Sequence, residues 1–372
     1  MIYLDNAATT CPDADALARA QEFHSELFYN PSARYGGGIL VASRLKSARE
    51  KLLAPIADSA KFELVFLSGG TEGDNFAVYA GAKRGNAVTT EGEHAAVYES
   101  FRALKNRGVE PRFAALNRDG SVNADALLSL VDEHTSLVSV VHVNNETGAV
   151  NDISALARAV KKKNPRTLFH SDGVQAYCKL PVRLPSEVDL YTVSAHKIGG
   201  LKGTGALIKR KGLVLSPLLY GGGQEENLRS GTENVFGAMA FAYAAEKRFA
   251  ALSDVKNRLL DCREQLASSL DPAIFTRISP KNGSEYILTV SAEGMRGEVL
   301  QRMLWDKGVV VGTGSACSSK HPHSRILQAC GYKAAVLDGV LRFSFSAETT
   351  AGEIEAAARI VGETARSFKE RL

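Results

Sequence analysis

The feature that most constrains this chain is the alternation of short β-rich runs with longer helical patterns over its first two thirds. Apolar runs at 61–67, 137–143 and 167–170 predict strands, each ending at polar or glycine residues. Helical patterns lie between them, for example at 95–106 and 153–163. Strands separated by helices indicate βαβ units and a mostly parallel sheet, which binds ligands at the carboxyl ends of its strands. Polar motifs that directly follow a strand are therefore the first candidates for a functional site.

From about Ser253 the pattern becomes that of a smaller α+β unit. Helices are predicted over 255–270 and 297–306, and strands over 286–290 and 308–311. The sequence shows no long internal repeat, low-complexity segment or Pro/Ser-rich linker. We expect the two units to share one rigid interface.

Composition narrows the classes of function. The 372 residues include 45 Lys and Arg against 41 Asp and Glu, and the net charge of +4 is spread out, which argues against a nucleic-acid-binding surface. The longest nearly apolar stretch, 235–245, is about half of a membrane span, and no secretory signal is visible, so we expect a cytoplasmic protein. Five cysteines without a CxxC pair indicate free thiols rather than disulfides or a zinc module.

The first motif with chemical meaning is 194–200, Ser-Ala-His-Lys-Ile-Gly-Gly, which follows the strand predicted over 190–193. A lone lysine in a turn is usually an ordinary surface residue. Lys197, however, lies where an α/β sheet builds its site, beside a histidine and small residues. A desolvated lysine forms Schiff bases with aldehyde cofactors, which is its use in pyridoxal-phosphate enzymes.

A second motif, 169–175, closes another predicted strand and contains Asp172, twenty-five residues before Lys197. Alone, Asp172 is explained more simply as the cap of the following helix. Paired with a Schiff-base lysine, it is the expected partner of a protonated pyridine nitrogen, which keeps the ring an electron sink. Gln175 follows three residues later, within reach of the ring hydroxyl.

Three other turns add weaker signals. The glycine turn at 68–75, which includes Gly70 and Thr71, opens a helix whose free N–H groups suit a phosphate, although it matches neither GxGxxG nor GxxxxGK[ST]. His94 opens a helix and is either an incidental residue or one placed over a cofactor ring. Asn144 and Asn145 directly follow a strand, where two amides can orient a carboxylate.

The most discriminating motif is 312–319, Gly-Thr-Gly-Ser-Ala-Cys-Ser-Ser. A cysteine among Gly, Ser and Ala, here Cys317, indicates a pliable loop with a thiol able to attack a substrate and carry a group away. The alternatives are an incidental loop cysteine or a metal ligand, because His321, His323 and Cys330 are near in sequence. Their spacing matches none of the usual zinc patterns, which disfavours the metal.

Taken in order, these motifs resemble the cysteine desulfurases, the nitrogen-fixation and housekeeping type within the class-V aminotransferase group of fold-type I pyridoxal-phosphate enzymes. The resemblance runs from residue 3 to residue 344. It is carried by 3–10, 30–32, 68–75, the His94 helix, 144–146, Asp172 with Gln175, 194–197, 221–225, 228–234, the Cys317 loop and 341–344.

The resemblance implies an α/β fold with a mostly parallel seven-stranded sheet in a large domain (15–252), and a smaller α+β domain made of 1–14 and 253–372. It also implies a site. Lys197 would hold pyridoxal phosphate, with Asp172 on the pyridine nitrogen, Gln175 on the ring oxygen and His94 stacked on the ring. The remaining implied roles are phosphate binding by Gly70, Thr71, Ser194 and His196, phosphate binding in the neighbouring subunit of a homodimer by Thr232, and substrate carboxylate binding by Asn145 and Arg342.

Cys317 would accept sulfur from L-cysteine as a persulfide and pass it to a scaffold protein or sulfur carrier for iron–sulfur clusters or tRNA thiolation. The sequence departs from the family at 345–348, where relatives have a second Arg, and at Cys178, where they have Gly. A selenocysteine lyase or another class-V enzyme remains an alternative, although a transaminase needs no nucleophilic thiol. A scaffold-binding, non-catalytic homologue has no physical need for Lys197, Asp172, His94 and Cys317 together.

Overall fold

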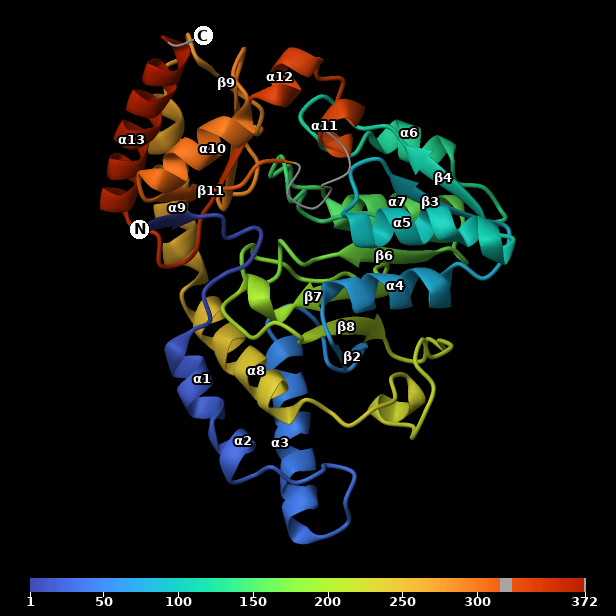
Figure 1. The fold of residues 1–372 in the computed structure, drawn as a ribbon. Helices are drawn as coiled ribbons and strands as arrows, with labels where there is room; N and C mark the ends of the chain where they lie inside the picture. Colours follow the sequence, from blue (N-terminus) through green and yellow to red (C-terminus); the bar gives the residue numbers. More distant parts are fainter. Residues whose placement is uncertain (315–322, 371–372) are drawn as a thin grey trace.

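The central sheet of the large unit follows the predicted architecture. The computed structural model describes residues 1–314 and 323–370, and within them seven strands form this sheet in the order β2-β8-β7-β6-β5-β3-β4 (Figure 1). Strand β8 runs antiparallel to its neighbours β2 and β7, and the other neighbouring pairs are parallel. The strands are β2 (Phe62–Leu67), β3 (Asn86–Thr90), β4 (Glu110–Ala114), β5 (Thr135–Ser139), β6 (Leu168–Asp172), β7 (Leu190–Ser194) and β8 (Gly205–Arg210).

The alternation of side chains along each strand supplies a core on both faces of this sheet. In β2, Phe62, Leu64 and Phe66 join one hydrophobic cluster, whereas Val65 and Leu67 join another. Burying each such side chain stabilises the fold by about 1.5–3 kcal/mol. One face is covered by α3 (Gly36–Leu53), α6 (Ala124–Ser129), α7 (Ile153–Lys163) and α8 (Val235–Ala250), and the other by α4 (Gly70–Gly81) and α5 (Ala95–Ala103).

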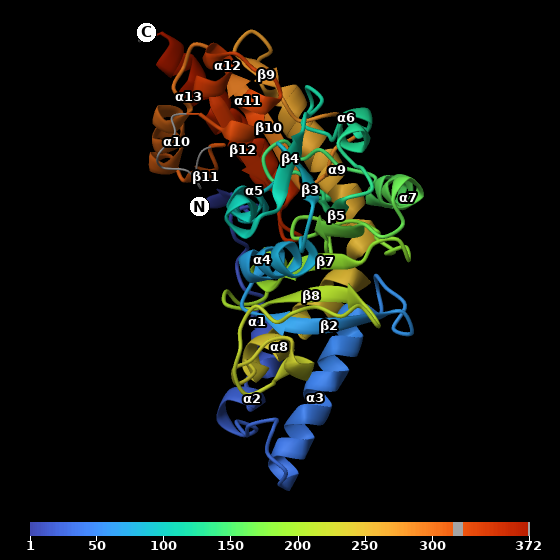
Figure 2. The ribbon, with the colours of Figure 1, turned by 90° about the vertical axis from the view of Figure 1, so that its right-hand side faces the viewer.

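Short polar side chains fix where several of these helices begin. Asp152 accepts a hydrogen bond from the Ala155 N–H at the start of α7, and Asn234 accepts one from Gly237 N–H at the start of α8. Asp13 caps α1 (Ala14–Ala20) in the same way, and helix α2 (Glu22–Ser25) follows α1. Helices α1, α2 and α3 extend away from the sheet at one end of the molecule (Figure 2).

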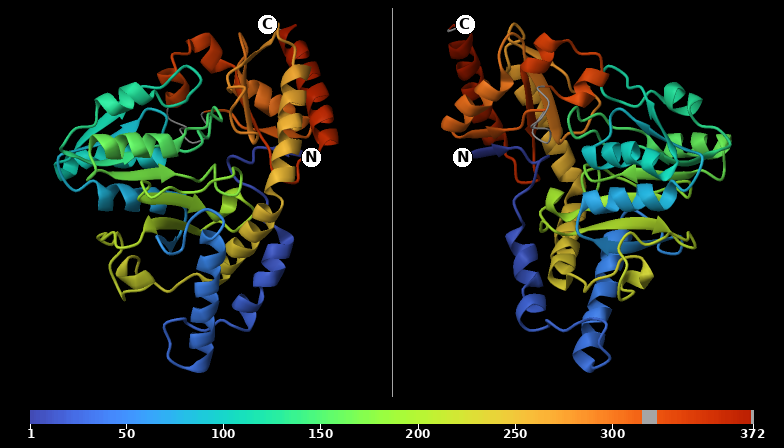
Figure 3. Two further views of the ribbon diagram at one scale, coloured as in Figure 1. Left: turned by 180° about the vertical axis from the view of Figure 1, so that it is seen from behind. Right: turned by 45° about the vertical axis from the view of Figure 1, so that its right-hand side comes forward.

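The smaller unit has its own antiparallel sheet and its own core. Within the described residues this sheet has the order β12-β10-β9, and the buried side chains of β10 and β12 pack with α9, α10 and α13 in one cluster. Helix α9 follows α8 in a run that leads from the large unit into the small one (Figure 3). The smaller unit contains α9 (Leu252–Ser269), β9 (Phe275–Arg277), β10 (Ile287–Ala292), α10 (Gly297–Asp306), α11 (Arg325–Ala329), α12 (Ala334–Asp338), β12 (Val340–Ser344) and α13 (Ala351–Lys369).

The first residues of the chain pack in this smaller unit. Strand β1 (Ile2–Leu4) pairs in parallel with β11 (Val309–Val311), and Leu4 belongs to the core of the small unit. This pairing supports the predicted division into 15–252 and 1–14 with 253–372, which stays a prediction. No helix in the described part of the chain is both long enough and apolar enough to cross a bilayer.

Most predicted elements lie within two or three residues of the observed ones, and two differ. The strand expected over 137–143 ends at Ser139, although Val140 N–H and His142 N–H still donate to the carbonyls of His170 and Asp172 at 3.1 and 2.9 Å. The helix expected over 95–106 divides into α5 and a 3-10 turn, η1 (Leu104–Arg107), because the chain tightens before the left-handed Gly108.

Candidate active site

A cavity of about 700 Å³ lies where the carboxyl ends of the large sheet meet the small unit. It brings together ten predicted site residues: Gly70, Thr71, His94, Asn145, Asp172, Gln175, Ser194, His196, Lys197 and Arg342. Thr232 is exposed and is not among the lining residues. Cys317 and His321 lie outside the described residues, whereas Gly314 and His323, on either side of that segment, line the cavity.

The amine of Lys197 is held at one end of this cavity. Lys197 ends the 3-10 turn η2 (Ala195–Lys197), which directly follows β7. Its Nζ donates hydrogen bonds to the carbonyl oxygens of Ala7 and Ala8, at 2.6 and 2.8 Å. The N-terminal segment of the chain therefore positions the lysine that the large sheet supplies.

Asp172 ends β6 and is 4% exposed. Burial raises the pKa of its carboxyl, while the nearby His94 and Lys197 oppose that shift. One Asp172 oxygen accepts the Val174 N–H at 2.9 Å, which fixes the orientation of the carboxyl group. A cationic ligand group placed here would offset the cost of burying the charge.

Close packing of the backbone keeps the strand ends together. A Cβ on Gly173, directly after Asp172, would lie 2.0 Å from the Tyr191 ring of the neighbouring strand β7. A glycine is therefore required for this approach. The close approach holds Asp172 and Lys197, which follow neighbouring strands, at one edge of the sheet.

His94 lies beside Asp172 and is neutral at neutral pH. Its Nδ1 accepts a hydrogen bond from the Ala96 N–H at 3.1 Å, so that the proton of the neutral ring is carried by Nε2. Burial lowers the pKa of His94, and Lys197 and Arg325 act in the same direction against Asp172. A ring nitrogen of His94 and carboxyl oxygens of Asp74 and Asp172 lie within 4.8 Å of one another. The uncharged imidazole can therefore stack on a ring bound beside Asp172.

Donors for an anion converge at the start of α4. The helix begins at Gly70 without a side-chain cap, so its first N–H groups remain available. Among the described residues, the buried Ser194 Oγ has no hydrogen-bond partner. Burial, together with Lys197, lowers the pKa of His196 to about 4, so this histidine can donate from a neutral ring. This combination suits a phosphate group.

Another part of the cavity is built by both units. Arg342, on β12, donates to the Asn145 carbonyl and to the Asp5 carboxylate, both at 2.9 Å. Over the described ranges, the buried Arg342 Nε and the Asn145 Oδ1 have no hydrogen-bond partner. A guanidinium held in this way can bind a carboxylate through two donors. We call this region the substrate end, and the region of Lys197, Asp172 and His94 the cofactor end.

A further contact closes the substrate end. Ser324, which caps α11, donates to the Glu146 carboxylate, and burial raises the pKa of Glu146 to about 7. Arg325 donates to the carbonyls of Glu91 and Glu93, and its guanidinium carbon lies 3.6 Å from the centre of the Tyr98 ring. The chain that follows 315–322 is therefore attached to the large unit.

Two buried carboxyl groups at the cofactor end were not predicted as site residues. Burial raises the pKa of Glu93 to about 8, and it raises the pKa of Asp74 well above its ordinary value. Asp74 lies in the predicted glycine turn and Glu93 precedes His94, so both were visible in the motifs. The signal that could have identified them is their position in these motifs. Asp74 follows Gly70 by one helical turn and so faces the same strand ends.

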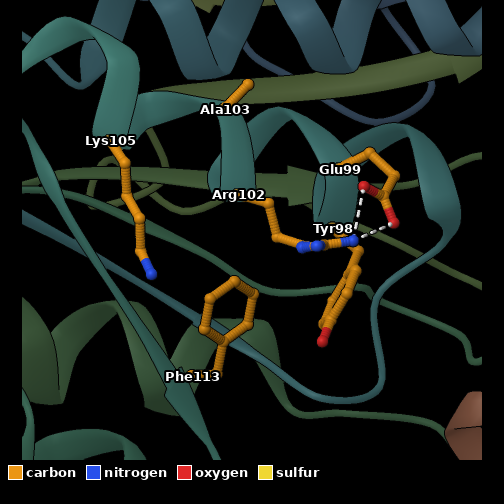
Figure 4. A pocket seen from close by; sticks show the side chains of 6 residues that line it. All are labelled: Tyr98, Glu99, Arg102, Ala103, Lys105 and Phe113. Atoms are coloured by element: carbon orange, nitrogen blue, oxygen red, sulfur yellow. Dashed lines mark hydrogen bonds and ion pairs between the residues drawn. The ribbon is translucent and has the colours of Figure 1, made fainter.

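A second hollow, of about 420 Å³, lies outside α5 (Figure 4). Its lining includes Lys105, Phe113 and the Glu99–Arg102 ion pair, whose shorter distance is 3.2 Å. Tyr98, Glu99 and Arg102 also line the main cavity, so the two hollows adjoin. The main cavity thus opens beside a rim of aromatic and charged side chains.

The structure does not bring the suggested metal ligands together among the described residues. His323 pairs with Asp338 at 2.8 Å, and Cys330 is buried with a pKa raised by burial to about 12. Cys11, Cys178, Cys262 and Cys330 are free thiols, as predicted. A metal-ligand role for Cys317 and His321 stays untested because both lie outside the described residues.

Comparison with known proteins places this geometry in a family. A model described as Aminotransferase class-V matches residues 2–357. Cysteine desulfurase 2 of Trichormus variabilis is 35% identical over 363 residues, which cover 95% of this chain and 90% of that protein. A solved structure named NifS-like protein has a TM-score of 0.92 at 34% identity, with 99% of both chains covered. SspA in complex with cysteine has a TM-score of 0.81 at 26% identity, covering 93% of this chain and 99% of that one. The chain therefore belongs to the cysteine desulfurases of the class-V aminotransferase family.

Proposed function

We propose that this protein releases alanine from L-cysteine with pyridoxal phosphate as cofactor and Cys317 as the first sulfur acceptor. The observation that carries the proposal is one cavity with Lys197, Asp172 and His94 at one end and Arg342 at the other. The first set suits an aldehyde cofactor with a basic ring, and the second suits an amino acid carboxylate. The family is pyridoxal-phosphate dependent, which agrees with this division.

The cofactor end fits pyridoxal phosphate on its own chemistry. The α4 N-terminus, Ser194 and neutral His196 provide donors for the phosphate, and the buried Asp172 carboxyl provides a partner for a protonated ring nitrogen. When bound, the cofactor supplies an electron sink for charge that develops at the substrate α-carbon. Lys197 is the residue that would hold it covalently.

Each residue at this end has one task. The Lys197 amine, once displaced by the substrate amine, takes the proton from the substrate α-carbon and returns a proton to the product. Asp172 would pair with the protonated ring nitrogen, whose charge would offset the burial that raises the pKa of the free carboxyl, and His94 would lie on the ring face. The Ala7 and Ala8 carbonyls hold the released lysine close to the reacting atoms.

Arg342 and Asn145 orient the substrate. The buried guanidinium binds the α-carboxylate, and the Asn145 amide adds a hydrogen bond from the neighbouring turn. Thr313 and Gly314, which precede the Cys317 segment in the sequence, line the same cavity as Arg342. The family's second Arg is absent at 345–348, so Arg342 carries the charge recognition.

The sulfur transfer balances without an external oxidant. The Cys317 thiolate forms an S–S bond with the substrate sulfur while the substrate Cβ–S bond breaks. The electron pair of that bond stays on the substrate carbon, which takes up a proton and leaves as alanine. The resulting persulfide passes its terminal sulfur to an acceptor protein, a scaffold or carrier of a cytoplasmic iron–sulfur or tRNA thiolation route. Thr232, exposed in one chain, is proposed to reach the phosphate site of a second subunit in a homodimer.

Mass spectrometry after brief exposure to L-cysteine tests the proposal. We expect one additional sulfur atom on the Cys317 peptide together with one released alanine per site. Alanine without the modified peptide would point to a lyase, including a selenocysteine lyase, and would remove Cys317 from the mechanism. The absence of both products would leave a binding protein that retains the fold. A Cys330→Ala variant is the matched control, because this thiol lies near Cys317 in sequence but is buried.

A further inference from the structure

A second lysine, Lys179, is buried behind the cofactor end. It is 4% exposed, and its Nζ donates a hydrogen bond to the Gln175 side-chain oxygen at 2.8 Å. The centre of the Tyr286 ring lies 5.4 Å from the same Nζ. Burial of an ammonium group is costly, so its retention at this position calls for a reason.

Lys179 is linked to Lys197 through a short series of hydrogen bonds. The Gln175 Nε2 donates to the Ala7 carbonyl at 2.9 Å. The same carbonyl accepts the Lys197 Nζ at 2.6 Å. The two lysines therefore share the Gln175 amide and one backbone carbonyl between them.

The chemistry of an ammonium group fixes the orientation of this amide. In its ammonium form, which prevails below its pKa of about 7, Lys179 donates hydrogen bonds and cannot accept them, so the Gln175 atom that it contacts is the oxygen. The Gln175 nitrogen then becomes the atom on the opposite side, toward Ala7 and the cavity. A glutamine with free rotation would present either atom to a ligand. Lys179 makes Gln175 a donor.

The local backbone delivers Lys179 to this place. The Lys179 N–H and the Leu180 N–H both donate to the Ala176 carbonyl, and Cys178, which directly precedes Lys179, has a left-handed backbone with φ of 59°. This turn brings residues 175 and 179 face to face. A non-glycine residue adopts this conformation only at a cost in backbone strain.

Lys179 also faces other charges. Burial lowers its pKa to about 7, with further lowering from Lys197 and Arg342 and an opposing effect from the Cys178 thiol. Arg248, from α8, lines the same small cavity together with Lys179 and Tyr286. Removing the Lys179 charge thus changes the field at Lys197 as well as the orientation of Gln175.

We propose that Lys179 is a positioning residue that holds the Gln175 amide with its nitrogen toward the ring oxygen of the cofactor. The inference rests on the proposed function, because it presupposes a cofactor with an anionic ring oxygen. A hydrogen bond from Gln175 neutralises part of that charge and so weakens the hold of the oxygen on a neighbouring proton. Lys179 thereby sets the protonation of the group that links Lys197 to the cofactor.

The absorbance of the cofactor-loaded protein, titrated with pH, tests this inference. We expect Lys179→Met to raise the midpoint of the absorbance change by about one pH unit, a tenfold change in proton affinity. Loss of the donor and loss of the nearby charge act in the same direction. Lys179→Gln leaves a polar group in the site and should give a smaller shift of the midpoint. It is the second variant to measure if Lys179→Met does not fold.

Two comparisons separate a positioning role from a structural one. In a Gln175→Ala background, Lys179→Met should lose more than half of its effect on the midpoint, because the amide is absent. Lys209→Met removes another buried lysine, which pairs with Glu63 on the edge strand β2. This variant should leave the midpoint of the absorbance change in place. An unchanged midpoint in Lys179→Met, or an equal shift with and without Gln175, overturns the inference. Failure of the unmodified protein to acquire any absorbance with pyridoxal phosphate would instead overturn the proposed function.

Discussion

The two ends of the cavity are built in different ways. The cofactor end comes mainly from one sheet, because Asp172 ends β6, Ser194 ends the neighbouring β7 and Lys197 follows three residues later. The N-terminal segment adds the carbonyls of Ala7 and Ala8. The substrate end is assembled across the two units, by contacts such as Arg342 with Asn145. The first rests mainly on the strand ends of one sheet, whereas the second depends on how the units meet. Loss of a residue should therefore abolish chemistry at the cofactor end and weaken recognition at the substrate end.

The largest effect is expected from Lys197→Ala. Removing the amine deletes both the attachment point and the group that moves the α-proton, so turnover should fall by about 10³-fold or more. The absorbance of the lysine-linked cofactor should disappear. Lys211→Ala, an exposed lysine after β8, serves as the control. Retention of more than a tenth of the turnover would contradict the assignment of Lys197.

Asp172→Asn should separate activity from stability. An amide cannot balance a protonated ring nitrogen, so turnover should fall by about 10²-fold. The pKa of Asp172 is raised by burial, so the folded protein loses stability as pH rises through that pKa and the carboxyl ionises. The cofactor-free Asn variant avoids this loss and should melt at a higher temperature at pH 8. A lower melting temperature would show that ionised Asp172 is already stabilised by its neighbours.

Arg342→Lys probes the substrate end alone. Lysine keeps the charge but loses the planar pair of donors, so the KM for L-cysteine should rise by about 10²-fold. Cofactor absorbance and its pH midpoint should remain as in the unmodified protein. Steady-state kinetics and a spectral titration of the same preparation provide both readings. A change in cofactor binding as large as that in KM would mean that the two ends do not act separately.

Glu93 gives a prediction about stability and pH. Its carboxyl is fully buried with a pKa raised to about 8, above the ordinary value of 4.5. The contribution of the protonated Glu93 carboxyl to the free energy of unfolding is fully present below pH 4.5 and is lost as pH rises through 8. Glu93→Gln removes this dependence, so the variant should gain stability relative to the unmodified protein between pH 5 and about 9. Denaturant unfolding at several pH values measures this difference. The same dependence of the free energy of unfolding on pH in both proteins would contradict the prediction.

The smallest effect is expected from Cys178→Gly, which introduces the residue type that the family resemblance implies at this position. Glycine relieves the left-handed backbone of Cys178 but loses a buried side chain, so the free energy of unfolding should change by less than about 1 kcal/mol. Turnover should stay within about twofold. A loss of persulfide on Cys317 in this variant would reveal that the Cys178 thiol takes part in sulfur transfer, and the separation of the two ends would need revision.

The same contrast explains what could be predicted from the sequence. Lys197, Asp172 and Gln175 follow strands, and a parallel sheet gathers its strand ends, so local pattern sufficed to bring them together. The contacts of Arg342 with Asp5 and of Ser324 with Glu146 join residues 337 and 178 positions apart. No local periodicity encodes such pairs, because they depend on how two separately packed cores meet.

The local sequence pattern also did not predict which polar side chains are buried. Glu93 and Asp74 are polar residues in polar motifs, and the sequence gives no sign that both are nearly or fully enclosed. Lys179 was visible only as a neighbour of an unusual cysteine. In each of these residues it is the surrounding fold, rather than the residue type, that changes the chemistry. Thr232 and Cys317 stay predictions, the first because its proposed role involves a second subunit that the structure does not contain and the second because it lies outside the described residues.

The pairing of β1 with β11 has a consequence for synthesis on the ribosome. Residues 2–4 emerge first, yet their partners at 309–311 emerge after more than four fifths of the chain has been made. At about 5–20 residues per second, the N-terminal segment waits many seconds for its place. The carbonyls of Ala7 and Ala8 can hold Lys197 only after that wait. A nascent chain that already contains the whole large sheet therefore still lacks the N-terminal contacts that complete the Lys197 site.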